Sequence, residues 1–288
     1  MRKYYKPSGK YSIMSLVYFV LSSLIILPLL GLLYAYAIWY IPFFYVNFLI
    51  TIGFGFAVGI VMMYFVVILG KVRNRQMATI LGALGGLVAM YFHWSVWADL
   101  VINAGESYGN SRIGVTVSNA NFLQVFNLAK NPGLLFELIG EINKKGTWGF
   151  KGFPVSGIFL AIIWLLEAVV VIFFGMIPPR NASQVPFCET NNAFFKDKKT
   201  SELNLIGDKQ QILNSLENDD LAHLESLSKV ANKEQDSHSI FTVYSSKNNE
   251  YYVSLVNQIA KGKGKFERKE IISYLSIKAP TAKVLLSK

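Results

Sequence analysis

Apolar residues fill the first two thirds of the chain in long runs, without the alternating or one-sided pattern of a soluble domain. No Lys, Arg, Asp or Glu occurs between Tyr11 and Gly70. A membrane-crossing helix needs about 20 apolar residues, so this stretch is long enough for two. Pro42 lacks a backbone N–H and disfavours helix at Ile41, so it divides the stretch. The pattern predicts four transmembrane helices, at residues 13–40, 43–69, 78–102 and 155–177.

The first apolar segment admits a second interpretation, as a cleaved signal peptide. A signal peptide has an apolar core of about 7–15 residues followed by small residues at the cleavage point. Here the apolar run is longer and leads into Trp39 and Tyr40. These features favour a retained helix, which Pro28 is expected to kink.

Basic residues flank the predicted helices unevenly, and this sets the expected orientation. Four stand in residues 1–12 and three between the second and third helices, whereas residues 103–154 hold them at much lower density. The positive-inside rule places the basic flanks and both termini in the cytoplasm and residues 103–154 outside. The basic residues concerned are Arg2, Lys3, Lys6, Lys10, Lys71, Arg73 and Arg75, against Arg112, Lys130, Lys144, Lys145 and Lys151 outside.

Composition agrees with a membrane protein and excludes several other classes. Hydrophobic residues make up 52% and charged residues 16% of the 288 positions, where a soluble domain carries about 25% charge. The net charge is +10, but seven of these charges lie in the two orienting flanks, so we predict no nucleic-acid partner. One cysteine excludes an intramolecular disulfide and a cysteine-rich metal site, and no cofactor is predicted.

The outer segment and the tail carry their own predicted elements. Within residues 103–154, helices are expected at 121–128 and after Pro132, ending at Gly146, where they lie on the membrane surface or cap the bundle. Residues 178–200 read as a linker, and residues 201–288 as a small α+β domain. Its predicted elements are helices at 208–216 and 219–232, strands at 239–245 and 250–259 with a turn at 247–249, and a strand or helix at 270–277.

Three polar residues in or beside the predicted helices are candidates for function. Glu167 lies near the middle of the fourth helix, where an unpaired acid costs a few kcal/mol. His93 lies at a similar depth in the third helix, so the two are expected to pair, as a structural clamp or as a ligand or proton site. Asp99 is expected to reach water at the outer face. A metal or hydrolytic site of these three is disfavoured because no ligand-spacing motif accompanies them.

Small residues recur at four-residue spacing within three of the predicted helices. Such pairs allow helices to approach closely, and packing inside the bundle is expected before homodimerisation because four helices supply partners for one another. The sequence does not predict an oligomeric state. The residues are Gly55, Gly59, Gly82, Gly86, Gly157 and Ala161.

Two short motifs in the tail have weak functional interpretations. Cys188 occurs in a sequence like the first half of a zinc knuckle, but Asn191 stands where the second cysteine is needed, so we predict no metal. Lys261, Lys263 and Lys265 form either an exposed turn or a patch attracted to anionic lipid. His223 and His238 have no partner that the sequence identifies.

One stretch of the chain resembles a family of uncharacterised bacterial four-span membrane proteins. The resemblance implies the inner membrane and brings no known activity. It covers about 40 residues, and is carried by Pro132-Gly133-Leu134-Leu135, Ile142-Asn143, Gly146-Thr147-Trp148-Gly149, Val155-Ser156-Gly157 and Trp164-Leu165-Leu166-Glu167-Ala168.

Three functional hypotheses follow from the sequence. The first is a non-enzymatic membrane protein whose bundle anchors a cytoplasmic domain, residues 201–288, that binds a protein partner or senses the membrane. The second is a component of small-solute or proton-coupled transport that uses Glu167 and His93. The third, which the sequence favours least, is an enzyme embedded in the membrane and acting on lipid.

Overall fold

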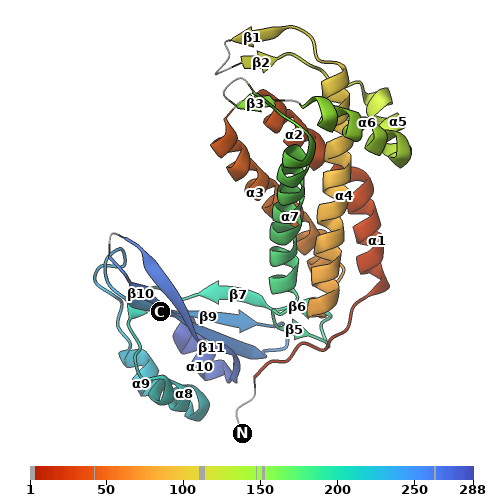
Figure 1. The fold of residues 1–288 in the computed structure, drawn as a ribbon. Coiled ribbons are helices and arrows are strands. Elements are labelled where there is room, and N and C mark those ends of the chain that lie inside the picture. The colour runs from red at the N-terminus through yellow and green to blue at the C-terminus, as the bar shows by residue number, and fades with distance from the viewer. Residues whose placement is uncertain (1–3, 42, 110–113, 147, 151–152, 263) are drawn as a thin grey trace. The chain divides into compact units, whose positions relative to one another are not determined.

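The computed structural model describes residues 4–41, 43–109, 114–146, 148–150, 153–262 and 264–288. It is mostly helical and has a sheet-containing C-terminal region (Figure 1). Clustering of the chain gives two compact units, Gly9–Gln184 and Met1–Ser8 together with Val185–Lys288. Some residues used in the sequence analysis lie outside the described residues, namely Arg2, Lys3, Pro42, Arg112, Thr147, Lys151 and Lys263.

The prediction of four long apolar helices is confirmed. The first is continuous from Ile13 to Tyr40, as α1 (Ile13–Leu21), a π-helical turn η1 (Ser22–Ile26) and α2 (Leu27–Tyr40). The second comprises α3 (Phe44–Val61) and the π-helical η2 (Met62–Leu69). The third and fourth are α4 (Arg75–Ile102) and α7 (Gly157–Ala182), and all four are long and apolar enough to cross a membrane.

Local chemistry explains where these helices begin and where the first changes its winding. The side chain of Ser12 accepts the backbone N–H of Met14, and that of Asn74 accepts the N–H of Met77, so each caps the helix that follows. Pro28 lies at the start of α2, directly after the π-helical turn. Because proline has no N–H to donate to the preceding turn, a π-helical turn is expected just before Pro28.

The fourth helix ends later than predicted, and the difference has a packing cause. Pro178 and Pro179 lie inside α7 instead of ending it. A Cβ built on Gly59 would lie 2.7 Å from Pro178 Cδ, and one built on Gly82 would lie 2.8 Å from Pro179 Cγ. The two proline rings therefore occupy the space that the glycines leave open, and this contact holds α7 in helical form to Ala182.

Four of the predicted small residues bring α7 close to its neighbours. A Cβ added to any of these four glycines would lie within 3.0 Å of an atom of α7. The four are Gly55 and Gly59 of α3 and Gly82 and Gly86 of α4. The other two, Gly157 and Ala161, do not pack in this way. Gly157 has a positive φ of 62° with nothing within 4 Å, and Ala161 is exposed, because the start of α7 lies beyond this contact.

Two short hairpins and two helices form the segment between α4 and α7. The predicted helices are present as α5 (Phe122–Lys130) and α6 (Pro132–Lys145), and α6 ends at Gly146 with a φ of 79°. The hairpins were not predicted; they pair β1 (Ser107–Gly109) with β2 (Gly114–Thr116) and β3 (Trp148–Phe150) with β4 (Phe153–Val155).

Aromatic residues near the end of α2 form hydrogen bonds to the segment between α4 and α7. Trp39 Nε1 donates to the carbonyl of Thr116 at 2.8 Å, and Tyr40 Oη donates to the carbonyl of Ser118 at 2.5 Å. The sequence does not predict these two contacts. The hydrogen bonds join the first helix to residues that follow the third.

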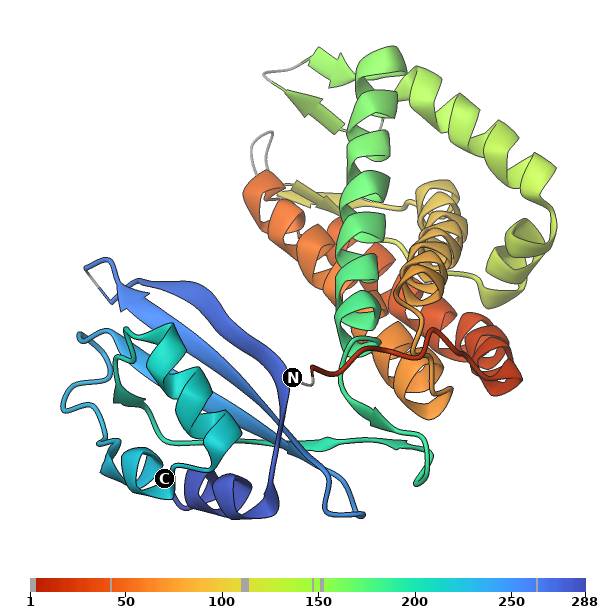
Figure 2. The ribbon, with the colours of Figure 1, turned by 90° about the horizontal axis from the view of Figure 1, so that it is seen from below.

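The C-terminal region is an α+β unit built on one antiparallel sheet. The sheet order is β11 (Phe266–Ile277), β10 (Tyr251–Ala260), β9 (His238–Ser245) and β7 (Lys196–Lys199), with β8 (Leu203–Asn204) also on β9. The helices α8 (Lys209–Asn218), α9 (Leu221–Ser226) and α10 (Ala279–Leu286) lie on one face of the sheet (Figure 2). Its core includes Leu203, Ile212, Leu216, Phe241, Leu255, Leu275 and Leu285.

Several tail predictions need correction. Residues 178–200 are not a linker, since they hold the end of α7, the hairpin of β5 (Phe187–Cys188) with β6 (Ala193–Phe194), and strand β7. The helix expected at 219–232 is confined to α9; in that stretch Leu224 is buried in the core, and Leu227, just after the helix, packs against it. Residues 270–277 are strand, as part of β11, and α10 was not predicted.

The N-terminal residues belong to the tail unit. Tyr4 forms a β-bridge with Leu275, and the N–H of Tyr5 donates to the carbonyl of Tyr274 at 2.9 Å. The Tyr5 ring lies edge-on to Tyr252 and Tyr274, at centroid distances of 5.6 and 6.3 Å. The outer edge of β11 is thus paired with the start of the same chain.

We predict that Gly55→Ala destabilises the bundle whereas Gly53→Ala, two residues away in α3, does not. The added methyl at Gly55 lies 2.9 Å from Phe174 Cβ and 3.0 Å from the Val171 carbonyl, whereas Gly53 has nothing within 4 Å. Overpacking of this kind costs about 1–3 kcal/mol. Thermal unfolding of the purified full chain in detergent measures the difference, and equal midpoints for both variants would contradict this packing.

Candidate functional site

Each of the four long helices contributes one polar side chain to a single contact in the bundle. Glu167 of α7 is hydrogen-bonded to Tyr34 of α2, with 2.5 Å between Tyr34 Oη and Glu167 Oε1. Tyr34 Oη also lies 2.7 Å from Thr51 Oγ1 of α3, and Thr51 Oγ1 donates to the carbonyl of Asn47 at 2.9 Å. His93 of α4 completes the group, with its Nε2 3.9 Å from Glu167 Oε1.

Aromatic rings enclose this four-helix contact. Tyr34 stacks on Phe54 with 4.1 Å between centroids, and its ring lies 4.6 Å from that of His93. Tyr34, Thr51 and His93 are buried, and the side chain of Glu167 is 17% exposed. Trp94, which neighbours His93, packs edge-on against Trp164 of α7. The polar groups therefore have one another, and little else, as partners.

The structure brings Glu167 and His93 together at similar depth, but not in a direct hydrogen bond. The 3.9 Å between their atoms exceeds hydrogen-bond length, and His93 Nδ1 is buried without a partner among the described residues. A carboxyl, a phenol and an imidazole in contact can exchange protons and can hold a small polar solute.

Two members of the contact were missed by sequence reasoning. Tyr34 resembles the other aromatics near the end of its helix, and Thr51 is an uncharged residue in an apolar run. The available signal was the pair Asn47 and Thr51, which puts two polar groups on one side of an otherwise apolar helix.

Asp99 does not reach water, contrary to expectation. Its side chain is fully buried, and Oδ2 accepts the backbone N–H of Asn121 at 2.7 Å. The chain folds back over the end of α4 at this point, where Asn121 caps α5. Asp99 thus fixes the start of α5, and no hydrogen bond or ion pair joins it to His93 or Glu167 among the described residues.

The tail candidates have ordinary structural partners. Lys261 pairs with Glu267 at 2.7 Å, across the hairpin from β10 to β11, and the pairing lowers the pKa of the Glu267 carboxyl. Lys265 is exposed beside it. Cys188 is buried, with its Sγ 3.3 Å from Glu250 Oε2. Both tail histidines have partners after all: His223 Nδ1 lies 2.7 Å from Ser215 Oγ, and His238 Nδ1 lies 2.9 Å from the Asp236 carbonyl.

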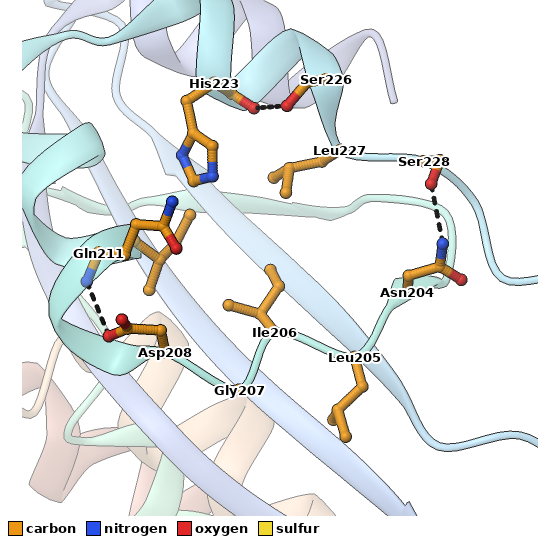
Figure 3. Close-up of a pocket in the computed structure, with 11 residues that line it drawn as sticks. Asn204, Leu205, Ile206, Gly207, Asp208, Gln211, His223, Ser226, Leu227 and Ser228 are labelled. Atoms are coloured by element: carbon orange, nitrogen blue, oxygen red, sulfur yellow. Dashed lines mark hydrogen bonds between the residues drawn. The ribbon is translucent and has the colours of Figure 1, made fainter.

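A pocket of about 240 Å³ lies between α8, α9 and the loop that follows β8 (Figure 3). Ile206 and Leu227 extend into it, and the ring of His223 points towards the side chain of Gln211. Asp208, at its rim, accepts the N–H groups of Gln210 and Gln211 and so caps α8. The pocket combines an apolar floor with polar edges, but the hydrogen bonds of Asp208 are already used within the protein.

Neither a metal site nor a relative identifies the activity. Among the described residues, no three His, Cys, Asp or Glu side chains gather closely enough to hold a metal ion. No protein-family model, curated protein or solved structure matches the chain. The resemblance to bacterial four-span proteins therefore stays a prediction.

We predict that Tyr34→Phe lowers the free energy of unfolding of the bundle by about 1–3 kcal/mol, because it leaves Thr51 and Glu167 without their shared partner. The matched control is Tyr64→Phe in η2, a half-exposed tyrosine, for which we expect a change within about 0.5 kcal/mol. Thermal unfolding followed by circular dichroism provides the comparison. A Tyr34→Phe protein as stable as the parent would show that the contact adds nothing to the fold.

Proposed function

We propose that the chain is a non-enzymatic, multi-pass protein of the bacterial inner membrane that anchors a cytoplasmic interaction domain. The observation that carries the proposal is the pairing of Tyr4 and Tyr5 with β11. Because of this pairing, the residues before Gly9 and the residues after Gln184 belong to one α+β unit. The segment Gly9–Gln184 between them contains all four apolar helices.

The surfaces of the four helices support membrane insertion. Large apolar side chains on all four are exposed, among them Leu24, Leu49, Leu87 and Leu165. Soluble monomers rarely expose contiguous apolar patches of more than a few hundred Å². A bilayer covers such side chains, and an even number of crossings returns the chain to its starting side, where Tyr4 and Tyr5 can meet β11.

Contacts between the two basic flanks support the cytoplasmic assignment. The N–H of Arg73 donates to the carbonyl of Lys10 at 2.8 Å, and the N–H of Gly9 donates to the carbonyl of Arg73 at 3.2 Å. The segment before the first helix and the loop between the second and third therefore meet. Both carry the excess of Lys and Arg that is typical of cytoplasmic flanks.

The second face of the tail sheet supports a protein partner for residues 201–288. Core residues Phe241 and Val243 alternate along β9 with Tyr244, which therefore faces away from α8, α9 and α10. Tyr244 packs against Tyr274, and Phe195 against Tyr252. Burial raises the pKa of all three tyrosines, so they remain neutral hydroxyls at physiological pH. Tyr5 already packs against Tyr252 and Tyr274, and tyrosine-rich surfaces are common in protein interfaces.

The alternative is a component of small-solute or proton-coupled transport. The observation that favours it is the contact of Glu167 with Tyr34 and His93, to which all four helices contribute. Intramembrane ionisable residues commonly mark solute and proton pathways.

The topology predicts a specific pattern of cysteine labelling. In a Cys188→Ser background, Lys247→Cys in the tail and Ser8→Cys before the first helix should react with a membrane-impermeant maleimide only after the inner membrane is opened. Glu137→Cys in α6 should react in intact cells with a permeabilised outer membrane. Labelling of either terminal position in intact cells would refute the cytoplasmic assignment.

Complementation of a strain that lacks the gene separates the two functions. If the tail is the working part, a chain ending at Gln184 fails to restore the phenotype and Glu167→Gln restores it. If the bundle transports, the truncated chain retains activity and Glu167→Gln does not. Equal amounts of each variant in the membrane fraction are the control, and restoration by the truncated chain would rule out the anchoring role.

A further inference from the structure

The hydrogen bonds that join α2, α3 and α7 form a chain of four oxygen atoms. Glu167 Oε1 lies 2.5 Å from Tyr34 Oη, Tyr34 Oη lies 2.7 Å from Thr51 Oγ1, and Thr51 Oγ1 lies 2.9 Å from the Asn47 carbonyl oxygen. All three distances are those of hydrogen bonds between oxygens. Each of the three links therefore needs a proton.

The two hydroxyl groups cannot supply three protons. Tyr34 and Thr51 have one hydroxyl proton each, and the Asn47 carbonyl can only accept. With an ionised Glu167, both ends of the chain accept, and one link is left with two oxygens facing each other without a proton. With a protonated Glu167, the carboxyl donates to Tyr34, Tyr34 to Thr51, and Thr51 to Asn47, so every link is made.

We propose that Glu167 is a proton-binding site and that the arrangement seen here is its protonated state. When the proton leaves, the O–H bond of the carboxyl breaks, Tyr34 turns its hydroxyl proton towards the carboxylate and Thr51 turns towards Tyr34. The link to Asn47 is then lost, and the direction of donation through the chain is reversed.

His93 is the acceptor for the departing proton. Its Nε2 lies 3.9 Å from Glu167 Oε1, so a small movement of either side chain closes the gap and an N–H bond forms as the O–H bond breaks. The groups in contact with Glu167 are Tyr34 from α2 and His93 from α4, with Thr51 of α3 behind Tyr34. Because a lone charge in an apolar interior is costly, the neutral pair and the carboxylate–imidazolium pair are the two states available to the site.

This inference deepens the alternative function, because a proton site is what proton-coupled transport requires. It does not depend on transport for its test, since the test reads the carboxyl group itself. A chain that holds the proton but moves no solute would retain this site and lose the transport proposal.

Infrared spectroscopy of the full chain in lipid nanodiscs provides the test. At neutral pH, acids in water are ionised, so we expect a C=O band of a protonated carboxyl that Glu167→Gln removes. Tyr34→Phe should shift the band to higher frequency, because the carboxyl loses the oxygen to which it donates. The controls are Glu141→Gln, an exposed acid paired with Lys144, and Asp99→Asn, a fully buried acid in α4; both should leave the Glu167 band in place.

Tryptophan fluorescence tests the transfer to His93. The ring of Trp94 lies 5.9 Å from that of His93, and a protonated imidazole quenches a neighbouring indole. Transfer from Glu167 to His93 keeps the number of protons on the pair constant, so we expect quenching of Trp94 and weakening of the Glu167 band to occur together. Raising the pH takes the proton away from the pair and should remove both the band and the quenching, and His93→Phe should show no quenching.

Three outcomes would overturn the proposal. The first is the absence, at neutral pH, of any protonated-acid band that Glu167→Gln removes. The second is a band that Asp99→Asn removes instead. The third, which applies even where Glu167→Gln does not fold, is an unchanged band in Tyr34→Phe.

Discussion

The close approach of α7 to α3 and α4 is the contact on which the bundle depends. In a bilayer, helices gain little from burying apolar surface against one another, so backbone proximity and van der Waals contact carry much of their association. Gly55, Gly59, Gly82 and Gly86 remove the side chains that would keep α7 away. The proline rings near its end then fill the space beside Gly59 and Gly82, so that one set of glycines fixes both the distance and the length of the helix.

That proximity makes the polar contact possible. Gly31 has the same role between α2 and α4, where an added Cβ would lie 2.9 Å from the backbone nitrogen of His93. With these helices so close, Tyr34 reaches across to Glu167 and to Thr51, and its ring meets His93. Inside a bilayer each of these groups needs a protein partner, so the loss of one leaves others unpaired and the contact acts as a unit.

The sequence predicted those features that depend on composition over many residues, and missed those that depend on helix rotation or long-range pairing. Four apolar helices follow from hydropathy, and the meeting of Glu167 with His93 from counting depth along two helices. Tyr34 and Thr51 become partners only through the rotation of α2 and α3. Asp99 is buried because a loop distant in sequence folds over it. The sequence of strand β7 suggests a loop because its lysines are charged and exposed. Charged residues are nevertheless common on edge strands, where they discourage pairing with another strand.

Connectivity gives the tail unit two covalent links to the apolar bundle. The segment Gly9–Gln184 begins after the residues that pair with β11, and it ends shortly after α7, the helix that carries Glu167. Tyr4 pairs with β11 and the chain after α7 leads to β7, and these two strands lie at the opposite ends of the strand order in the tail sheet. The tail sheet is therefore joined to the apolar segment by the chain at two places, once before α1 and once after α7, and these connections lead to opposite edges of the sheet.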